Sequence, residues 1–224
     1  MISPQLSAIN PNEVLLYLSY HGGKVPVEIE REIALCSECI KKVARPRLTY
    51  RIFPVEEGQP LGAGFRLEGE DIRRHLSGSR EAILMAATLG PDVETLLMRT
   101  QVTDMAKALI LDSCASVAIE NVCDHFEADL RAEYAEKGWF LTDRFSPGYG
   151  DFPISQQTAF CEALDVRRRI GLTVSASGIL IPRKSVTAVL GACTTAPKRR
   201  SSGCAHCTRF RTCTIRKDGI TCGM

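Results

Sequence analysis

The chain has 224 residues, 45% of them apolar and 24% charged, with a formal net charge of +2 and ten cysteines. This composition suits one hydrophobic core with a small appended module. No apolar run approaches the roughly 20 residues that cross a bilayer, and the first residues lack a signal-peptide pattern. We therefore expect a cytoplasmic protein that is not bound to a membrane. Its thiols should stay reduced and serve as ligands, reactive groups or core residues.

A helix is predicted over residues 28–43, where apolar side chains recur at helical spacing and charged side chains face outward. Cys36 and Cys39 lie inside this pattern as a Cys-x-x-Cys pair. A redox or metal site there is the weaker explanation, because neither a helix-breaking loop nor a strand–helix–strand pattern surrounds the pair. We therefore interpret the pair as part of an amphipathic helix.

Residues 48–55 and 64–67 are predicted to be strands. Residues 81–90 follow as a buried segment that ends at the stop signal Gly90-Pro91. The longest helix is expected over residues 104–136.

Two charged residues interrupt the apolar part of that helix, Asp112 and Glu120. A buried charge needs a partner, because removing it from water is costly. Glu120 shares a helix face with Asp124 by its spacing. A structural ion pair and a carboxylate of a binding site both remain open for Glu120.

Residues 144–153 read Arg-Phe-Ser-Pro-Gly-Tyr-Gly-Asp-Phe-Pro. The guanidinium of Arg144 offers a planar fork for a carboxylate, and Gly148 and Gly150 let a backbone approach a ligand closely. Tyr149 lies between the two glycines. Such a loop could hold a small zwitterion, such as an amino acid; the alternative is a plain surface turn between helices.

The rest of the main domain is predicted as a short helix at residues 155–165 and strands at 170–175 and 185–190. We expect these strands to pair through a turn near residues 182–184. Residues 196–203 have the composition of a linker. Helices and strands alternate without a regular strand–helix–strand period, which indicates an α+β fold.

A basic tail follows at residues 198–224, with a charge of +6 against −4 for the rest of the chain. It contains four cysteines: Cys204, Cys207, Cys213 and Cys222. A segment this short cannot fold by burying apolar side chains alone. We therefore expect zinc or an iron–sulfur cluster to stabilise it, with His206 as an alternative ligand. The other explanation is a tail that binds no metal. Nucleic-acid binding is disfavoured, because only Phe210 could stack on a base.

The order Arg-x-x-Pro-Gly-Tyr, with a proline four residues later, resembles the S-adenosylmethionine-binding loop of the activation domain of cobalamin-dependent methionine synthase. Other segments continue the resemblance in the family's order over about residues 60–195. They are residues 84–90, 104–112, 118–120, 170–173 and 181–186.

The resemblance implies a curved antiparallel β-sheet with surrounding helices in residues 1–197, with the Cys-rich tail of residues 198–224 appended. It implies that Arg144 holds the methionyl carboxylate of S-adenosylmethionine and that Glu120 supports the ammonium side. Gly148 and Gly150 would admit the nucleoside. Tyr149 would lie near the cobalt and take the catalytic position.

The chain also departs from the family. Asp151 stands where the family has a small residue, and Val189 begins a stretch where the family has aromatic residues. Phe152 or Trp139 would then have to supply adenine stacking. No Asp-x-His-x-x-Gly cobalamin-binding motif occurs, so a corrinoid would arrive on another protein.

These features lead to one functional hypothesis and one alternative. The hypothesis is a stand-alone methyltransferase component, a reactivation subunit that binds S-adenosylmethionine. It would support reductive methylation of cob(II)alamin on a separate corrinoid-dependent methyltransferase, with methionine synthase or its cobalamin domain as the expected partner. A flavodoxin-like protein or another one-electron donor would supply the electron. The alternative is a non-catalytic adaptor, held together by zinc or an iron–sulfur cluster, that docks a corrinoid or redox partner.

Overall fold

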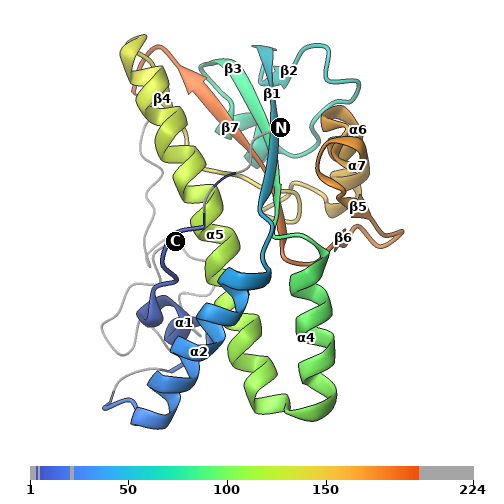
Figure 1. The fold of residues 1–224 in the computed structure, drawn as a ribbon. Coiled ribbons are helices and arrows are strands. Elements are labelled where there is room, and N and C mark those ends of the chain that lie inside the picture. Colours follow the sequence, from blue (N-terminus) through green and yellow to red (C-terminus); the bar gives the residue numbers. More distant parts are fainter. Residues whose placement is uncertain (1–3, 5, 21–22, 197–224) are drawn as a thin grey trace.

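A five-stranded antiparallel sheet in the order β2-β1-β3-β7-β4 forms the centre of the computed structural model, which describes residues 4, 6–20 and 23–196 (Figure 1). Its strands are β1 (Arg47–Glu56), β2 (Gln59–Pro60), β3 (Ser79–Thr88), β4 (Phe140–Leu141) and β7 (Ser185–Cys193). A separate ribbon pairs β5 (Thr173–Val174) with β6 (Leu180–Ile181).

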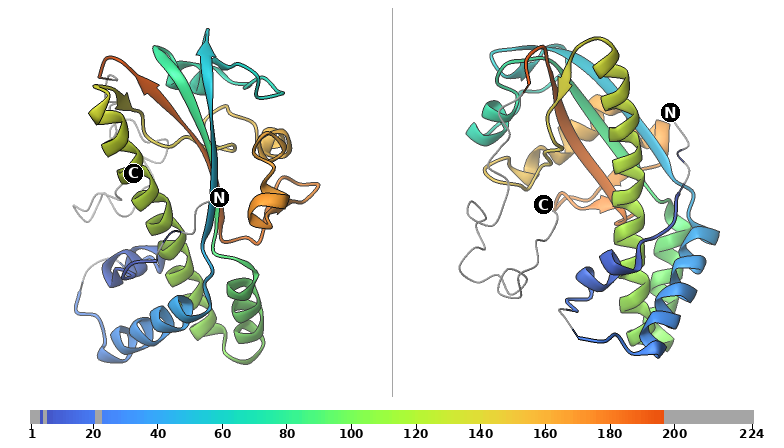
Figure 2. Two further views of the ribbon diagram at one scale, coloured as in Figure 1. Left: turned by 45° about the horizontal axis from the view of Figure 1, so that its top comes forward. Right: turned by 90° about the vertical axis from the view of Figure 1, so that its left-hand side faces the viewer.

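Helices cover both faces of the sheet (Figures 1 and 2). The long helix α5 (Met105–Glu136) lies along one face, and its first half continues below the sheet. There it packs with α1 (Pro11–Tyr17), α2 (Val27–Val43) and α4 (Pro91–Thr103). The other face is covered by α6 (Gln157–Leu164) and α7 (Val166–Ile170), which follow the short helix η1 (Ile154–Gln156). Helix α3 (Glu70–His75) precedes β3. Among the described residues, no helix is both long and apolar enough to span a membrane.

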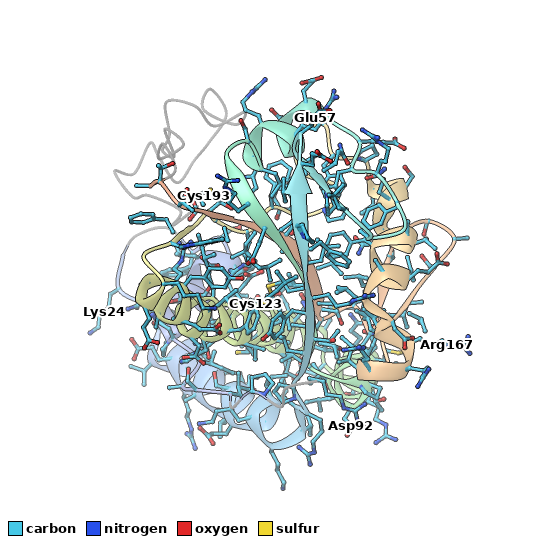
Figure 3. All side chains as sticks on the ribbon, turned by 90° about the horizontal axis from the view of Figure 1, so that it is seen from above. Lys24, Glu57, Asp92, Cys123, Arg167 and Cys193 are labelled. Atoms are coloured by element: carbon cyan, nitrogen blue, oxygen red, sulfur yellow. The ribbon has the colours of Figure 1, made fainter. Side chains whose placement is uncertain are left out.

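Strand β3 contributes to two hydrophobic cores because its side chains alternate between the faces of the sheet. One core lies on the α5 side and contains Ile83, Met85 and Ala87, together with Cys123, which Figure 3 labels. The other lies beneath α6 and α7 and contains Ala82, Leu84 and Ala86. A strand buried on both faces has no polar alternation, which explains the continuous apolar run at residues 82–87.

The structure confirms the mixed α+β class and the antiparallel sheet surrounded by helices. The predicted helices at residues 28–43 and 104–136 are α2 and α5, and Asp104 caps α5 by accepting a hydrogen bond from the Lys107 N–H. Residues 155–165 form η1 and α6.

The strand predicted at residues 64–67 is wrong. The side-chain amide of Gln59 accepts a hydrogen bond from the Leu67 N–H at 2.8 Å and donates one to the Leu67 carbonyl at 3.0 Å. The buried side chain of Gln59 thus pairs with the backbone N–H and carbonyl of Leu67, which a neighbouring strand would otherwise have to do.

The predicted pairing of residues 170–175 with residues 185–190 is also wrong. Within the first stretch, β5 pairs with β6, whereas β7 lies between β3 and β4. Both stretches do contain strands, because β-branched residues suit a pleated backbone. Their partners depend on the burial of both faces of β7, which composition alone does not show.

Candidate functional site

The candidate site begins at an irregularity where the chain runs beside β7. Leu141 pairs with Ala192, and Phe145 forms the next bridge with Val189, so four residues advance on one strand while three advance on the other. The extra residue acts as a β-bulge. Leu141 lies in the core on the α5 side and Phe145 in the opposite core. The bulge therefore reverses which face of the sheet each following side chain points to. As a result, Arg144 lies on the face that α5 covers.

Arg144 is held by three carboxylates that lie on one face of α5. Its Nη2 is 3.0 Å from Glu120 Oε2 and 2.7 Å from Asp124 Oδ1, and its Nη1 is 2.9 Å from Glu127 Oε2. The carboxylates occur at positions i, i+4 and i+7, so the helix period aligns them. The side chain of Arg144 is only 18% exposed. We call these four residues the Arg144 cluster.

Negative charge exceeds positive charge around this cluster. Arg131 also contacts Glu127 and pairs with Asp143 at 3.2 Å. Two guanidinium groups thus meet four carboxylates. Burial raises the pKa of the Glu120 carboxyl above its ordinary value, and the positive charge of Arg144 only partly opposes that effect. The site is consequently suited to a ligand with a positively charged group.

The loop after Arg144 is compact and exposes Tyr149. The Gly148 N–H donates to the Phe152 carbonyl at 2.8 Å, and the Phe152 N–H donates to the Tyr149 carbonyl at 3.0 Å. Gly148 has a φ of 94°, which few side-chain-bearing residues adopt. Tyr149 is 62% exposed. The structure therefore presents Tyr149 to an incoming molecule.

Gly150 lies close to α3 (Glu70–His75). A Cβ at this position would lie 2.5 Å from Asp71 Oδ2, at the start of α3. The loop thus approaches the side chain of Asp71 closely at this position. That Gly150 admits the nucleoside stays a prediction.

Asp151 accounts for one departure from the family. Its carboxylate accepts hydrogen bonds from the N–H of Glu70 at 2.7 Å and of Asp71 at 2.9 Å, at the amino end of α3. These bonds lower the pKa of the Asp151 carboxyl below its ordinary value. Asp151 thus caps a helix and joins the loop to α3.

We predict that Asp151→Ala lowers the melting temperature at neutral pH, because two N–H groups lose their acceptor. A carboxyl whose pKa is lower in the folded state stabilises above its unfolded pKa, about 3.9, and loses that contribution as the pH falls through the folded value. The difference between wild type and variant should therefore shrink in acid. Thermal denaturation over a pH series measures it, with Asp129→Ala, an exposed carboxylate on α5, as control. A difference independent of pH contradicts this role.

The two aromatic residues proposed for adenine stacking differ in burial. Phe152 is 1% exposed and stacks on Phe145, with ring centroids 6.3 Å apart. Trp139 packs against Tyr134, with centroids 6.1 Å apart. The ring of Phe152 is enclosed in the core, so the suggestion that it stacks on adenine is wrong. Trp139 is half-buried, and its stacking on adenine stays a prediction.

Sequence reasoning missed Tyr17, at the last residue of α1. Burial and then the negative charge of Glu120 raise the pKa of Tyr17, and Tyr149 and Asp124 act in the same direction. Tyr17 is therefore close to the Arg144 cluster, and it is 52% exposed. A signal for α1 was present: Asn10 caps the helix and Pro11 opens it.

The expected metal site lies outside the described residues, since all four tail cysteines belong to residues 197–224. Within residues 4, 6–20 and 23–196, no group of three or more His, Cys, Asp or Glu could hold a metal ion. In the Cys-x-x-Cys pair, Cys36 is buried and Cys39 is exposed. Burial raises the pKa of Cys36 to about 12, so this thiol stays protonated at neutral pH.

Comparison with known proteins gives a relationship in fold. No known family model matches the chain, and no curated protein matches it. Among solved structures, the crystal structure of the MetH reactivation domain bound to AdoHcy is similar, with a TM-score of 0.60 and 14% sequence identity over 99% of this chain and 90% of that chain. The chain therefore has the fold of that reactivation domain.

Proposed function

We propose that the chain binds S-adenosylmethionine at the Arg144 cluster and acts as a reactivation subunit for a separate corrinoid-dependent methyltransferase, with methionine synthase as the expected partner. The observation that carries this proposal is one partly buried guanidinium held by three carboxylates beside an exposed tyrosine. The guanidinium suits the carboxylate of the ligand, and the three carboxylates and the tyrosine ring suit its positively charged groups.

The cluster suits the zwitterionic end of S-adenosylmethionine. Three of the five N–H groups of Arg144 are used by Glu120, Asp124 and Glu127, so two remain to donate to a ligand carboxylate. The excess of carboxylates suits the ligand's ammonium and sulfonium groups. Tyr17 and Tyr149 offer exposed rings next to those charges, and aromatic faces attract cations.

The chain's residues need only hold the sulfonium beside the acceptor. The partner's corrinoid would supply the nucleophile: after a separate one-electron donor, such as a flavodoxin-like protein, has reduced its cobalt from Co(II) to Co(I), that cobalt would take the methyl group as the S–CH3 bond breaks, and the sulfonium would become a neutral thioether. In this proposal Arg144 and Glu120 orient the ligand, and Tyr149 lies where the corrinoid of the partner protein approaches. Positioning of this kind can supply much of a rate enhancement.

The similar fold supports the proposal, because that reactivation domain was crystallised with AdoHcy, the demethylated product of such a transfer. Titration of the full chain with S-adenosylmethionine and with AdoHcy in a calorimeter tests it. We expect saturable binding of both ligands, tighter for the positively charged donor. An absence of heat at millimolar S-adenosylmethionine would refute the proposal.

Binding should also release protons from Glu120. Burial raises the pKa of Glu120 in the free protein, and a ligand cation nearby would stabilise the carboxylate and lower that pKa. Affinity should therefore increase as the pH rises through the titration of Glu120 and level off above it. In the free protein the same raised pKa means that ionising Glu120 reduces stability as the pH rises.

Calorimetry in two buffers of different ionisation enthalpy measures the released protons. Glu120→Gln should bind more weakly at neutral pH and lose most of the pH dependence. If wild type and variant show the same pH dependence, Glu120 does not contact the ligand cation.

The adaptor remains a second candidate, favoured by Val189. This residue is fully buried in β7, so the position where the family has an aromatic residue offers no ring to a ligand. Elemental analysis and an absorption spectrum of anaerobically purified protein separate the two candidates. Stoichiometric zinc with no ligand binding supports the adaptor, whereas a broad band at about 400 nm indicates an iron–sulfur cluster that could carry the electron.

A further inference from the structure

Two arginines of β1 point to the sheet face that α6 and α7 cover. Side chains alternate along a strand, and Leu48 lies in the core on the α5 side whereas Phe53 lies in the opposite core. Arg47 and Arg51 are therefore on the same side as Phe53, and both are exposed. They are four residues apart, which is roughly 13 Å at the rise of a strand.

A third arginine comes from α7, which lies beside β1 (Figure 1). Arg169 Nη1 is 3.5 Å from the hydroxyl of Thr49, the residue midway between Arg47 and Arg51. The guanidinium of Arg47 also lies toward the end of α7, since a Cβ added at Gly171 would be 3.4 Å from its Nη1. Three guanidinium groups thus meet where α7 packs on β1. We call Arg47, Arg51 and Arg169 the arginine patch.

The arginine patch has no matching carboxylates. Among the described residues, none of its three arginines forms an ion pair. The carboxylates that lie closest in sequence to Arg169 are Glu162 and Asp165. Asp165 pairs with Arg168 at 3.8 Å, so its charge is already opposed. Like charges brought together in this way repel each other, and a bound anion would relieve that repulsion.

Support of the protein's own structure accounts for only part of these groups. Arg51 donates one hydrogen bond to the Ala163 carbonyl at 2.8 Å, and its Cζ lies 5.0 Å from the ring centroid of Phe53. Cations are favourable near the carboxyl end of a helix, but α7 has only five residues, and Arg47 and Arg51 belong to a strand. Each guanidinium carries five N–H groups, so most donors of the patch remain for a ligand.

The charge and the spacing of the patch fit a small molecule with several phosphate groups. Guanidinium forks bind phosphate oxygens in pairs, and one phosphate group carries up to about two negative charges and three acceptor oxygens. A carboxylate would neutralise only one of the three cations. Nucleic acid also offers phosphates, but its bases need exposed aromatic faces, and the ring beneath Arg51, that of Phe53, is buried.

We propose that the arginine patch is a binding site for a soluble oligophosphate, either an inorganic phosphate chain or the triphosphate of a nucleotide. In this site Arg47 and Arg51 hold the two ends of the phosphate chain and Arg169 holds its middle. The patch lies on the sheet face opposite the Arg144 cluster, so this inference does not rest on the proposed function.

Titration of the full chain with inorganic triphosphate in a calorimeter tests the site. We expect one saturable site whose affinity falls as salt is added, because salt screens exposed charges. Arg47→Gln removes a charge but no side-chain hydrogen bond to another described residue, and it should weaken binding at least about tenfold. Arg169→Gln should act in the same direction. Arg99→Gln, at an exposed arginine of α4 outside the patch, is the matched control and should bind like wild type.

Parallel titrations with ATP and with a single-stranded oligonucleotide identify the source of the phosphates. Equal affinities for triphosphate and ATP support a site for the phosphate chain alone, and tighter binding of ATP supports a nucleotide site. The proposal is overturned if wild type does not bind triphosphate at millimolar concentration, if only the oligonucleotide binds, or if both patch variants bind triphosphate unchanged. Melting temperatures without ligand verify that each variant is folded.

Discussion

Arg144→Ala is expected to weaken S-adenosylmethionine binding by about 10- to 150-fold. A charge-assisted hydrogen bond to a carboxylate contributes about 1.5–3 kcal/mol, and 1.4 kcal/mol corresponds to a factor of ten. The loss should be large because Arg144 is the one cation of its cluster, and without it the ligand carboxylate would face Glu120, Asp124 and Glu127. Calorimetric titration of both proteins at constant salt measures the ratio.

Two further variants separate ligand binding from structural effects. Arg144→Lys keeps the positive charge but lacks the planar fork, so it should bind with intermediate affinity. Arg131→Ala removes a guanidinium that also contacts Glu127, but its other partners are Asp143 and the carbonyls of Leu141 and Thr142, outside the Arg144 cluster. It should change stability more than affinity. Equal affinity in wild type and Arg144→Ala rules out the assigned site.

Phe152→Ala is expected to lower the free energy of unfolding by about 3–5 kcal/mol, as truncation of buried aromatic residues does. The ring of Phe152 is fully enclosed in the core beneath α6 and α7, where it stacks on Phe145. Its backbone also closes the loop through Gly148 and Tyr149. Denaturant unfolding measures the change.

Tyr149→Ala is the matched control in the same loop. Its ring is exposed, so stability should change little while affinity for S-adenosylmethionine falls. The opposite result, a stable Phe152→Ala and a destabilised Tyr149→Ala, would show that the two rings exchange roles in solution. If the two variants lowered the free energy of unfolding equally, Phe152 would not be the anchor of the loop and Tyr149 would not be merely an exposed contact residue.

Local sequence signals were sufficient for the long elements. The largely apolar stretch within residues 104–136 and the periodicity of residues 28–43 both predicted helices that the structure contains. Residues 64–67 misled because their composition resembles a strand, yet the single side chain of Gln59 satisfies the backbone of Leu67. Contacts of that kind join residues through space and leave no periodic pattern.

The candidate site was only partly accessible from the sequence. Glu120 stood out because a lone charge in an apolar helix needs a partner, and Arg144 supplies that partner. Glu127 and Tyr17 were missed. Glu127 lies among other charged residues near the end of α5, and Tyr17 ends the short helix α1, so neither residue is distinctive in the sequence. Phe152 was suggested to stack on the ligand, but it lies in the core, and Asp151, a departure from the family pattern, contacts α3.

The amino-acid sequence by itself determined the mixed α+β class, the burial of residues 81–90 and the need of Glu120 for a partner, because each depends on local periodicity or on the cost of burying a charge. Tertiary structure alone decided which strands pair, which side of the sheet Arg144 faces and which residues of its loop are exposed. These follow from one extra residue beside β7 and from the burial of both sheet faces. Neither is visible until distant segments are brought together.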